Sequence, residues 1–452
     1  VQQVEGKMNN FLKEVLDSST EFRNINENLE AGKKSVLVTG LLETQRADMS
    51  AYLLRNGTRH AVVAHSDAEA QKLHKSLIKK GIKSLFIQSD EIRFYSVEAK
   101  DRKSEAELVE SLYRLSGKDY DIAVFSPDSL MKKYIPGEII TGSSQEIAYG
   151  EVLDKNQLIE KLINSGYVRE HKVEGIGQFS MRGGIIDIFT PGTENPLRIE
   201  LFDDEVDSIR TFDIFTQKSI EKIKKVNILP ARSFIYPQDL TKAVSDIQSD
   251  IGKDTSEDIS FDLERIKNRI YFEGVSKYIN YFYEKETTIF DYINDISLFV
   301  INDPNRVVEK FQNIHQEFSD SFQSALEKGF AVKREGDLLL PASFSLENIR
   351  EKNNIFNTTI TSSVKDFPID AIVDIETREA RVFNGKIFDF INEIKYLRSN
   401  DYVSVISLKD EELTKSLQKA LKENNVGSVR INMDTAEAEA SNVIFTDEHF
   451  AG

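Results

Sequence analysis

The sequence predicts an α/β protein: a doubly wound parallel sheet domain, split by a β-rich α+β insertion and followed by a small α/β domain. Three patterns support this fold class. Short apolar segments alternate with amphipathic helices up to about residue 125, turn-rich extended segments replace them after about residue 142, and a strand–helix–strand pattern begins near residue 364. With 452 residues, the chain has room for three or four domains.

The first sheet is predicted from short apolar segments that read as buried strands: 35–40, 60–65, 84–88 and 121–125. A helix should begin after the second strand, because Ser66 and Glu69 are spaced as a capping box, and Gly81 is placed to end it. A charged helix around residues 104–115 precedes the fourth strand. Strands that alternate with helices favour a parallel sheet.

The same sheet is expected to resume after the insertion, with helices between residues 240 and 290 and a strand at 296–302. A last βαβ unit is expected from strands at 402–408 and 428–433, with a helix between them. Helical spacing also covers the first 29 residues, through Phe11, Leu12, Val15 and Leu16. The predicted domains are the first half of the sheet domain, the insertion, the second half and the last domain: 1–143, 144–230, 231–365 and 366–452.

Composition narrows the classes of function. Lys and Arg number 58 against 75 Asp and Glu, and this net charge of −17 argues against tight non-specific DNA binding by the whole chain, although it leaves room for a local basic patch. The absence of Cys excludes disulfides, thiol catalysis and Cys-based metal sites. No apolar run approaches 18 residues, so we expect a cytoplasmic protein with no membrane contact.

A nucleotide-binding sheet would carry the phosphate loop GxxxxGK[ST] directly after its first strand. Gly40 stands there, but Gln45 replaces the second glycine, Arg46 replaces the lysine and Ala47 replaces the hydroxyl that holds magnesium. Gln45 does not adopt positive φ cheaply, and Ala47 offers no metal ligand. The sequence therefore predicts a degenerate phosphate loop without ATP hydrolysis.

No other catalytic or metal site is predicted. At the end of the strand at 296–302, Asn302 and Asp303 read either as the remnant of a magnesium-binding acidic pair or as an Asn-Asp-Pro turn. The six histidines include no HExxH pair, and no GxSxG motif is present. His65 ends a strand, where a structural role is favoured over a ligand role.

One segment of the insertion, residues 197–202, alternates with the period of two that is typical of a strand. Its apolar positions should face a core: Leu197, Ile199 and Leu201. Arg198, Glu200 and Phe202 then share the opposite face. Two readings of Phe202 stay open, an exposed anchor for a protein partner or a ring buried by a covering element.

Arg182 precedes two adjacent glycines, Gly183 and Gly184, in the strand before. Glycines remove side chains from a strand, which allows a neighbouring backbone or a partner to approach closely. Arg182 would then be prominent on the surface. The alternative is an ion pair with a nearby acid such as Asp203 or Asp204.

The string GQFSMRGGIIDIFTPGTENPLRIELFDDEVDSIRTFDIFTQKS closely resembles a signature shared by two families of nucleotide-excision-repair proteins. They are the bacterial transcription-repair coupling factors (Mfd) and the helicase UvrB, and the signature lies in the domain that both use to bind UvrA. The resemblance covers residues 150–234 and continues more weakly over the flanking halves. It implies a degenerate RecA-like (UvrB-like) sheet domain. Gln45, Arg46 and Ala47 favour the coupling factors, because UvrB keeps an intact loop.

The resemblance carries three residues over as UvrA-contacting positions: Arg182, Arg198 and Phe202. It implies an adaptor without catalytic residues or a cofactor of its own, and the chain looks like the N-terminal part of a longer protein. The domains that bind RNA polymerase and double-stranded DNA, and the motor that uses ATP and magnesium, lie farther on in that family. The motor is expected to mask the UvrA-binding face in the intact protein.

Two other functions stay open. A UvrB-type ATP-dependent helicase would need nucleotide binding at residues 40–47, and a plain DNA-binding module would show a steep salt dependence of duplex binding. Around residues 435–441 the chain departs from the family, because it is short there and lacks a glycine-hydrophobic pattern.

Overall fold

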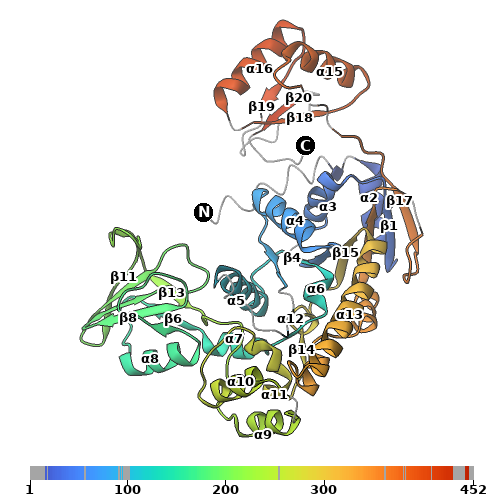
Figure 1. Cartoon of the computed structure of the whole chain (residues 1–452). Helices are drawn as coiled ribbons and strands as arrows, with labels where there is room; N and C mark the ends of the chain where they lie inside the picture. Colours follow the sequence, from blue (N-terminus) through green and yellow to red (C-terminus); the bar gives the residue numbers. More distant parts are fainter. Residues whose placement is uncertain are drawn as a thin grey trace.

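A seven-stranded parallel sheet forms the centre of the protein (Figure 1). The computed structural model describes residues 16–17, 19–54, 58–89, 92, 94, 102–252, 255–360, 363–379, 381, 383–408, 410–430 and 443–446. The sheet's strands are β1 (Ser35–Thr39), β2 (His60–Val63), β3 (Ser84–Phe86), β4 (Ile122–Phe125), β15 (Leu298–Asn302), β16 (Asn353–Thr358) and β17 (Ala371–Asp374). Their order is β17-β1-β16-β15-β2-β4-β3, so strands from both sides of the insertion interleave, as the sequence predicts.

Both faces of this sheet are buried because its strands are apolar on both sides. One row runs across five strands with every side chain fully buried: Val36, Ile355, Val300, Val62 and Val124. It packs against α2 (Thr20–Glu30), α3 (Arg46–Tyr52) and α4 (Asp67–Lys79). The opposite face packs against α5 (Arg102–Ser116), α6 (Pro127–Leu130), α12 (Ile289–Tyr292), α13 (Pro304–Glu327) and α14 (Ala342–Arg350).

Both ends of α4 lie where the sequence predicts them. The Ser66 hydroxyl accepts a hydrogen bond from the Glu69 amide at 3.4 Å, which starts the helix. Gly81 follows the helix with φ +75°, the left-handed conformation that glycine adopts at low cost. The expected helix through Phe11, Leu12 and Val15 lies outside the described residues.

The boundary predicted between residues 365 and 366 is too early. β17 pairs with β1 in parallel, from Val36↔Ala371 to Thr39↔Asp374, so the first sheet reaches at least residue 374. The last domain contains α15 (Ile387–Ser399), β18 (Ser404–Ser407), α16 (Glu411–Glu423), β19 (Val429–Arg430) and β20 (Val443–Thr446). β20 lies between β18 and β19, so the two strands predicted as one βαβ unit are not neighbours. Residues 431–433 and 435–441 are outside the described part.

A helical unit with its own aromatic-rich core lies below the sheet in Figure 1. It contains α7 (Gly137–Ser143), α9 (Thr241–Asp250), α10 (Glu257–Lys267), α11 (Ile279–Phe282) and two 3-10 helices, η2 (Val275–Tyr278) and η3 (Lys333–Asp337). β5 (Lys133–Tyr134) pairs with β14 (Thr287–Thr288), which joins segments from the two sides of the insertion.

None of the helices in the described part of the chain has both the length and the apolar character that a membrane span requires.

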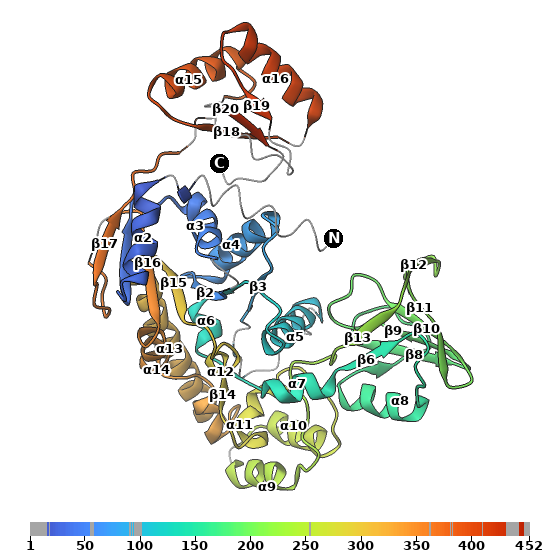
Figure 2. The ribbon, with the colours of Figure 1, turned by 180° about the vertical axis from the view of Figure 1, so that it is seen from behind.

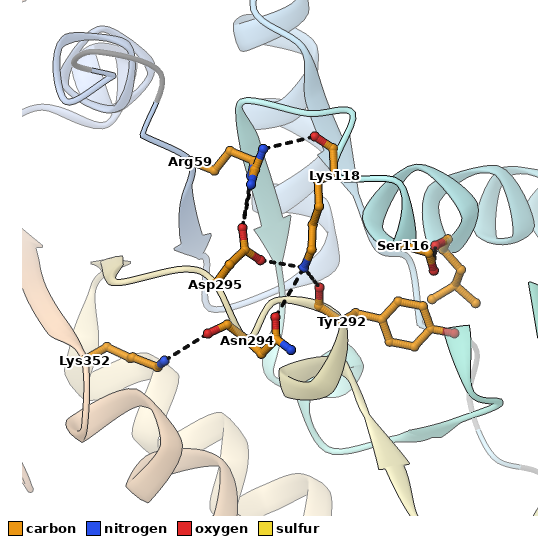
Figure 3. A network of polar contacts seen from close by, with 8 residues as sticks. Arg59, Ser116, Lys118, Tyr292, Asn294, Asp295 and Lys352 are labelled. Atoms are coloured by element: carbon orange, nitrogen blue, oxygen red, sulfur yellow. Dashed lines mark hydrogen bonds and ion pairs between the residues drawn. The ribbon is translucent and has the colours of Figure 1, made fainter. Parts of the chain in front are cut away.

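A polar network also joins the two halves of the sheet domain (Figure 3). Asp295, just before β15, accepts hydrogen bonds from Arg59 Nη2 at 2.7 Å and from Lys118 Nζ at 2.5 Å. Arg59 precedes β2 and Lys118 precedes β4, so the network lies at the amino ends of the strands. Lys118 Nζ also donates to the Tyr292 carbonyl oxygen at 2.6 Å. The insertion therefore leaves the two halves connected through side chains as well as through the sheet.

The insertion is a separate β-rich domain, set apart from the large sheet beyond α5 and α7 in both views (Figure 2). Its elements are β6 (Gln145–Ala148), α8 (Lys155–Asn164), β7 (Val168–Arg169), β8 (Gln178–Arg182), β9 (Ile185–Ile188), β10 (Leu197–Phe202), β11 (Glu205–Phe212), β12 (Ser219–Ile223) and β13 (Lys225–Ile228). Six of the strands form one sheet in the order β12-β11-β10-β9-β8-β7. α8 packs on its inner face through Leu158 and Leu162.

Candidate protein-docking surface

The outer face of the six-stranded sheet carries the side chains singled out in β10. Leu197 and Ile199 are fully buried in the core of the domain, and Arg198, Glu200 and Phe202 alternate with them on the opposite side. The Phe202 side chain is 77% exposed. The predicted alternation is confirmed, and of the two readings of Phe202 the structure supports the exposed ring.

A fixed backbone presents Phe202 to solvent. Phe202 is the last residue of β10 and pairs with Glu205 across a tight turn in which Asp203 has φ +53°. The segment before α8 braces this turn, because the Leu153 amide donates to the Asp204 carbonyl oxygen at 2.7 Å. Lys155 Nζ donates to the Asp203 carbonyl oxygen, also at 2.7 Å. The ring therefore stands on an ordered hairpin rather than on a loose loop.

The two glycines form the turn between β8 and β9, not part of a strand as predicted. Gly183 has φ +60°. The Leu201 amide donates to the Gly184 carbonyl oxygen at 2.8 Å, and a Cβ on Gly184 would lie 2.8 Å from the Leu201 carbonyl oxygen. The close approach expected from glycine is thus made by β10 of the same domain.

Arg182 ends β8 and is exposed. Its guanidinium donates to the carbonyl oxygen of His171. The considered pairing with Asp203 or Asp204 does not occur; Asp204 instead lies 3.4 Å from Lys155 Nζ. Arg182 therefore offers a cation to solvent within the described part of the domain.

Arg198 is held differently. Its Nε and Nη2 donate to the two carboxylate oxygens of Asp187 at 2.7 and 2.9 Å, and its guanidinium lies 4.5 Å from the Phe212 ring centroid. The side chains are 19% and 9% exposed for Arg198 and Asp187. The hydrogen bonds that Arg198 donates to Asp187 raise the pKa of Arg198 above its usual value. A cross-strand carboxylate therefore neutralises Arg198, and its predicted contact with UvrA stays a prediction.

Sequence reasoning missed one exposed aromatic residue on this side. Phe215 is 89% exposed in the turn between β11 and β12, and Gln217 of the same turn accepts a hydrogen bond from Arg198 Nη2 at 3.1 Å. The signal was a Phe inside a polar turn segment, Asp213 to Lys218, just beyond the end of a strand. We call the outer surface formed by Arg182, Arg198, Phe202 and residues 213–218 the docking face.

Residues 40–47, predicted to be a degenerate phosphate loop, lie at the carboxyl end of β1. Gly40 has φ +79°, a 3-10 turn covers Glu43–Gln45, and α3 begins at Arg46. Arg46 forms a bidentate pair with Asp303, both contacts at 2.9 Å, and the side chains are 7% and 22% exposed. The cation at the lysine position of the template is therefore engaged by a carboxylate of the same chain.

The neighbours of this pair add polar groups but no metal ligand set. Asn302 Oδ1 accepts a hydrogen bond from Asn357 Nδ2 at 2.9 Å, and His65 Nδ1 lies 3.8 Å from Asp303 Oδ2, too far for a hydrogen bond. A hydrogen bond with Glu69 and the ion pair with Lys72 lower the pKa of Glu43, so a carboxylate remains charged beside the loop. Within the described ranges, no group of three His, Asp or Glu is placed to hold a metal ion.

Comparison with known proteins connects these features. Residues 146–234 match the family described as the UvrB interaction domain. A transcription-repair-coupling factor of Bacillus subtilis (strain 168) is 27% identical over 462 residues, which cover 98% of this chain and 38% of that protein. One from Staphylococcus epidermidis (strain ATCC 35984) is 25% identical over 93% of this chain and 37% of its own length. Nearly the whole chain is similar to the transcription-repair-coupling factors.

The likeness to the transcription-repair-coupling factors includes the sheet domain as well as the insertion, since it covers nearly the whole chain. The resemblance inferred from residues 177–219 is confirmed, and the matched domain contains the complete docking face. The chain spans about 38% of the length of the Bacillus relative. A chain from a solved S. cerevisiae structure of Dbp5 bound to Nup159 and Gle1, at 9% identity, matches 91% of this chain and 67% of its own length with a TM-score of 0.20, so we draw no relationship from it.

Proposed function

We propose that this chain is an adaptor that binds the nucleotide-excision-repair protein UvrA through its docking face. The observation that carries the proposal is Phe202, exposed on a braced hairpin inside the domain that matches the UvrB interaction domain. Exposed aromatic rings next to arginines are the residues that contribute most to the affinity of protein interfaces. Arg182 supplies an exposed cation to this surface, and Arg198 lies between the exposed ring and the turn at residues 213–218.

The proposed cellular role is to bring UvrA to stalled RNA polymerase. The names of the relatives support a role in transcription-coupled repair. In a longer protein of this kind, the domains that bind RNA polymerase and double-stranded DNA, and the ATP-driven motor, would lie in regions other than those in this chain. The motor would cover the docking face until the polymerase is engaged, since an exposed apolar patch favours a covering contact. A cytoplasmic location follows from these partners.

We also propose that the chain itself neither binds nor hydrolyses ATP. The engagement of Arg46 by Asp303 supports this, because a phosphate group would have to compete with a carboxylate that is already bound. Ala47 offers no hydroxyl for magnesium. A UvrB-type helicase would need the opposite arrangement at residues 40–47.

Two titrations test the proposed function. We expect saturable binding of the chain to immobilised UvrA and no saturable heat on titration with ATP and magnesium. Binding of ATP without binding of UvrA would support the helicase alternative instead. Duplex DNA binding that falls steeply with salt, without UvrA binding, would support the DNA-binding alternative.

A further inference from the structure

The turn between β11 and β12 is locked by its own hydrogen bonds. Asp213 Oδ1 accepts from the Phe215 amide at 3.1 Å, the Thr216 amide at 2.7 Å and the Thr216 hydroxyl at 2.8 Å. The Gln217 amide donates to the Asp213 carbonyl oxygen at 2.8 Å. Gln217 has φ +59°, a conformation that is uncommon for a residue other than glycine. The turn therefore holds one conformation against a local backbone preference.

The locked turn rests on Arg198. Gln217 Oε1 accepts from Arg198 Nη2 at 3.1 Å, and Gln217 Nε2 donates to the Ile214 carbonyl oxygen at 2.7 Å. Arg198 is in turn fixed by both oxygens of Asp187. A continuous chain of contacts thus runs from the middle of the sheet to the residue just before Phe215.

The fixed turn places the aromatic side chain of Phe215 in solvent. The bonds that close the turn use the Asp213, Thr216 and Gln217 side chains and the backbone, and none of them needs a phenylalanine at position 215. Its ring is among the most exposed large apolar side chains of the described residues. Because hydrogen bonds already fix the backbone of the turn, covering Phe215 would cost little backbone entropy.

The turn is also within reach of a partner that covers Phe202. It contacts Arg198, which is four residues before Phe202 on β10, a separation of about 13 Å at roughly 3.3 Å per residue. A standard protein interface covers about 800 Å² on each partner, enough to include both positions.

We propose that Phe215 is a second aromatic anchor for UvrA and that Arg198 and Gln217 are positioning residues for it. The inference rests on the proposed function and extends it. Arg198 then acts mainly through the turn, since Asp187 already neutralises its charge, and the docking face carries two aromatic anchors on either side of this arginine.

A double-mutant cycle tests the proposal, with UvrA affinity as the readout. Phe215→Ala is expected to weaken binding about tenfold. Gln217→Asn keeps a residue that tolerates positive φ and leaves the Arg198–Asp187 pair in place, but its shorter side chain loses the contact to Arg198. We expect it to weaken binding about threefold in the wild-type background and to have no further effect in the Phe215→Ala background.

Several results would overturn the proposal. Phe215→Ala binding within twofold of wild type, while Phe202→Ala weakens binding, would remove Phe215 as an anchor and leave the proposed function intact. An equal loss from Gln217→Asn in both backgrounds would show that Gln217 does not act through Phe215. Failure of the wild-type chain to bind UvrA would overturn both proposals. Urea unfolding of each variant, expected to match wild type, separates these outcomes from misfolding.

Discussion

Replacing Arg46 with methionine is expected to lower the free energy of unfolding of the sheet domain by about 3 kcal/mol. The substitution removes the bidentate partner of Asp303 and leaves its carboxylate, 22% exposed, without a counter-ion. The pair joins α3 to the first residue before α13, so it also links the two halves of the split domain. Urea unfolding of the purified chain measures the change.

Two further variants show whether the Arg46 effect comes from the pair. Arg46→Met combined with Asp303→Asn should be less destabilised than the sum of the single variants, because no uncompensated charge remains. Lys242→Met is the matched control, since Lys242 pairs with Glu284 on the open surface and should leave unfolding unchanged. An Arg46→Met variant that unfolds at the same urea concentration as wild type would contradict a structural role for the pair.

Replacing Arg198 with methionine is expected to destabilise the β-rich domain by about 2 kcal/mol and to weaken UvrA binding. The Asp187 carboxylate is almost buried and would lose both hydrogen bonds from the guanidinium. The turn at residues 213–218 would lose its contact with the sheet at the same time. Circular dichroism during urea unfolding reports the stability, and titration of immobilised UvrA reports the affinity.

The matched control for Arg198 is Arg182→Met. Arg182 is exposed and its guanidinium donates to a carbonyl oxygen, so its loss should change stability by less than about 0.5 kcal/mol while still lowering affinity for UvrA. Adding Asp187→Leu to Arg198→Met should recover stability, because the uncompensated carboxylate is then gone. Equal stability of Arg198→Met and wild type would show that the arginine is not needed to hold the sheet and turn together.

The sequence predicts on which side of β10 the Phe202 side chain lies, but it does not predict that the side chain is exposed. A period of two fixes which residues share a side of a strand, and the buried Leu197 and Ile199 fix which side is the core. Whether the outer side is open depends on what else packs there. The turn at residues 213–218 lies over Arg198 but leaves Phe202 uncovered, and this difference comes from tertiary structure.

The ion-pair partners of Arg198 and Arg46 could not be predicted from the sequence for a related reason. Arg198 meets Asp187 because β9 and β10 pair in one register, and the eight residues 189–196 separate the two strands in sequence. Arg46 meets Asp303 across 257 positions of the chain. Charge patterns along a sequence give the signs of such residues but not their pairing, so neither ion pair could be predicted from the sequence.

Binding of UvrA by Phe202→Ala, measured beside Phe388→Ala, tests the docking face most directly. Both rings are largely exposed, 77% for Phe202 and 73% for Phe388, which lies on α15 in the last domain. Phe202→Ala should weaken UvrA binding at least about tenfold with unchanged unfolding, and Phe388→Ala should bind like wild type. Wild-type affinity in Phe202→Ala, or an equal loss in both variants, would contradict a UvrA-binding role for this face.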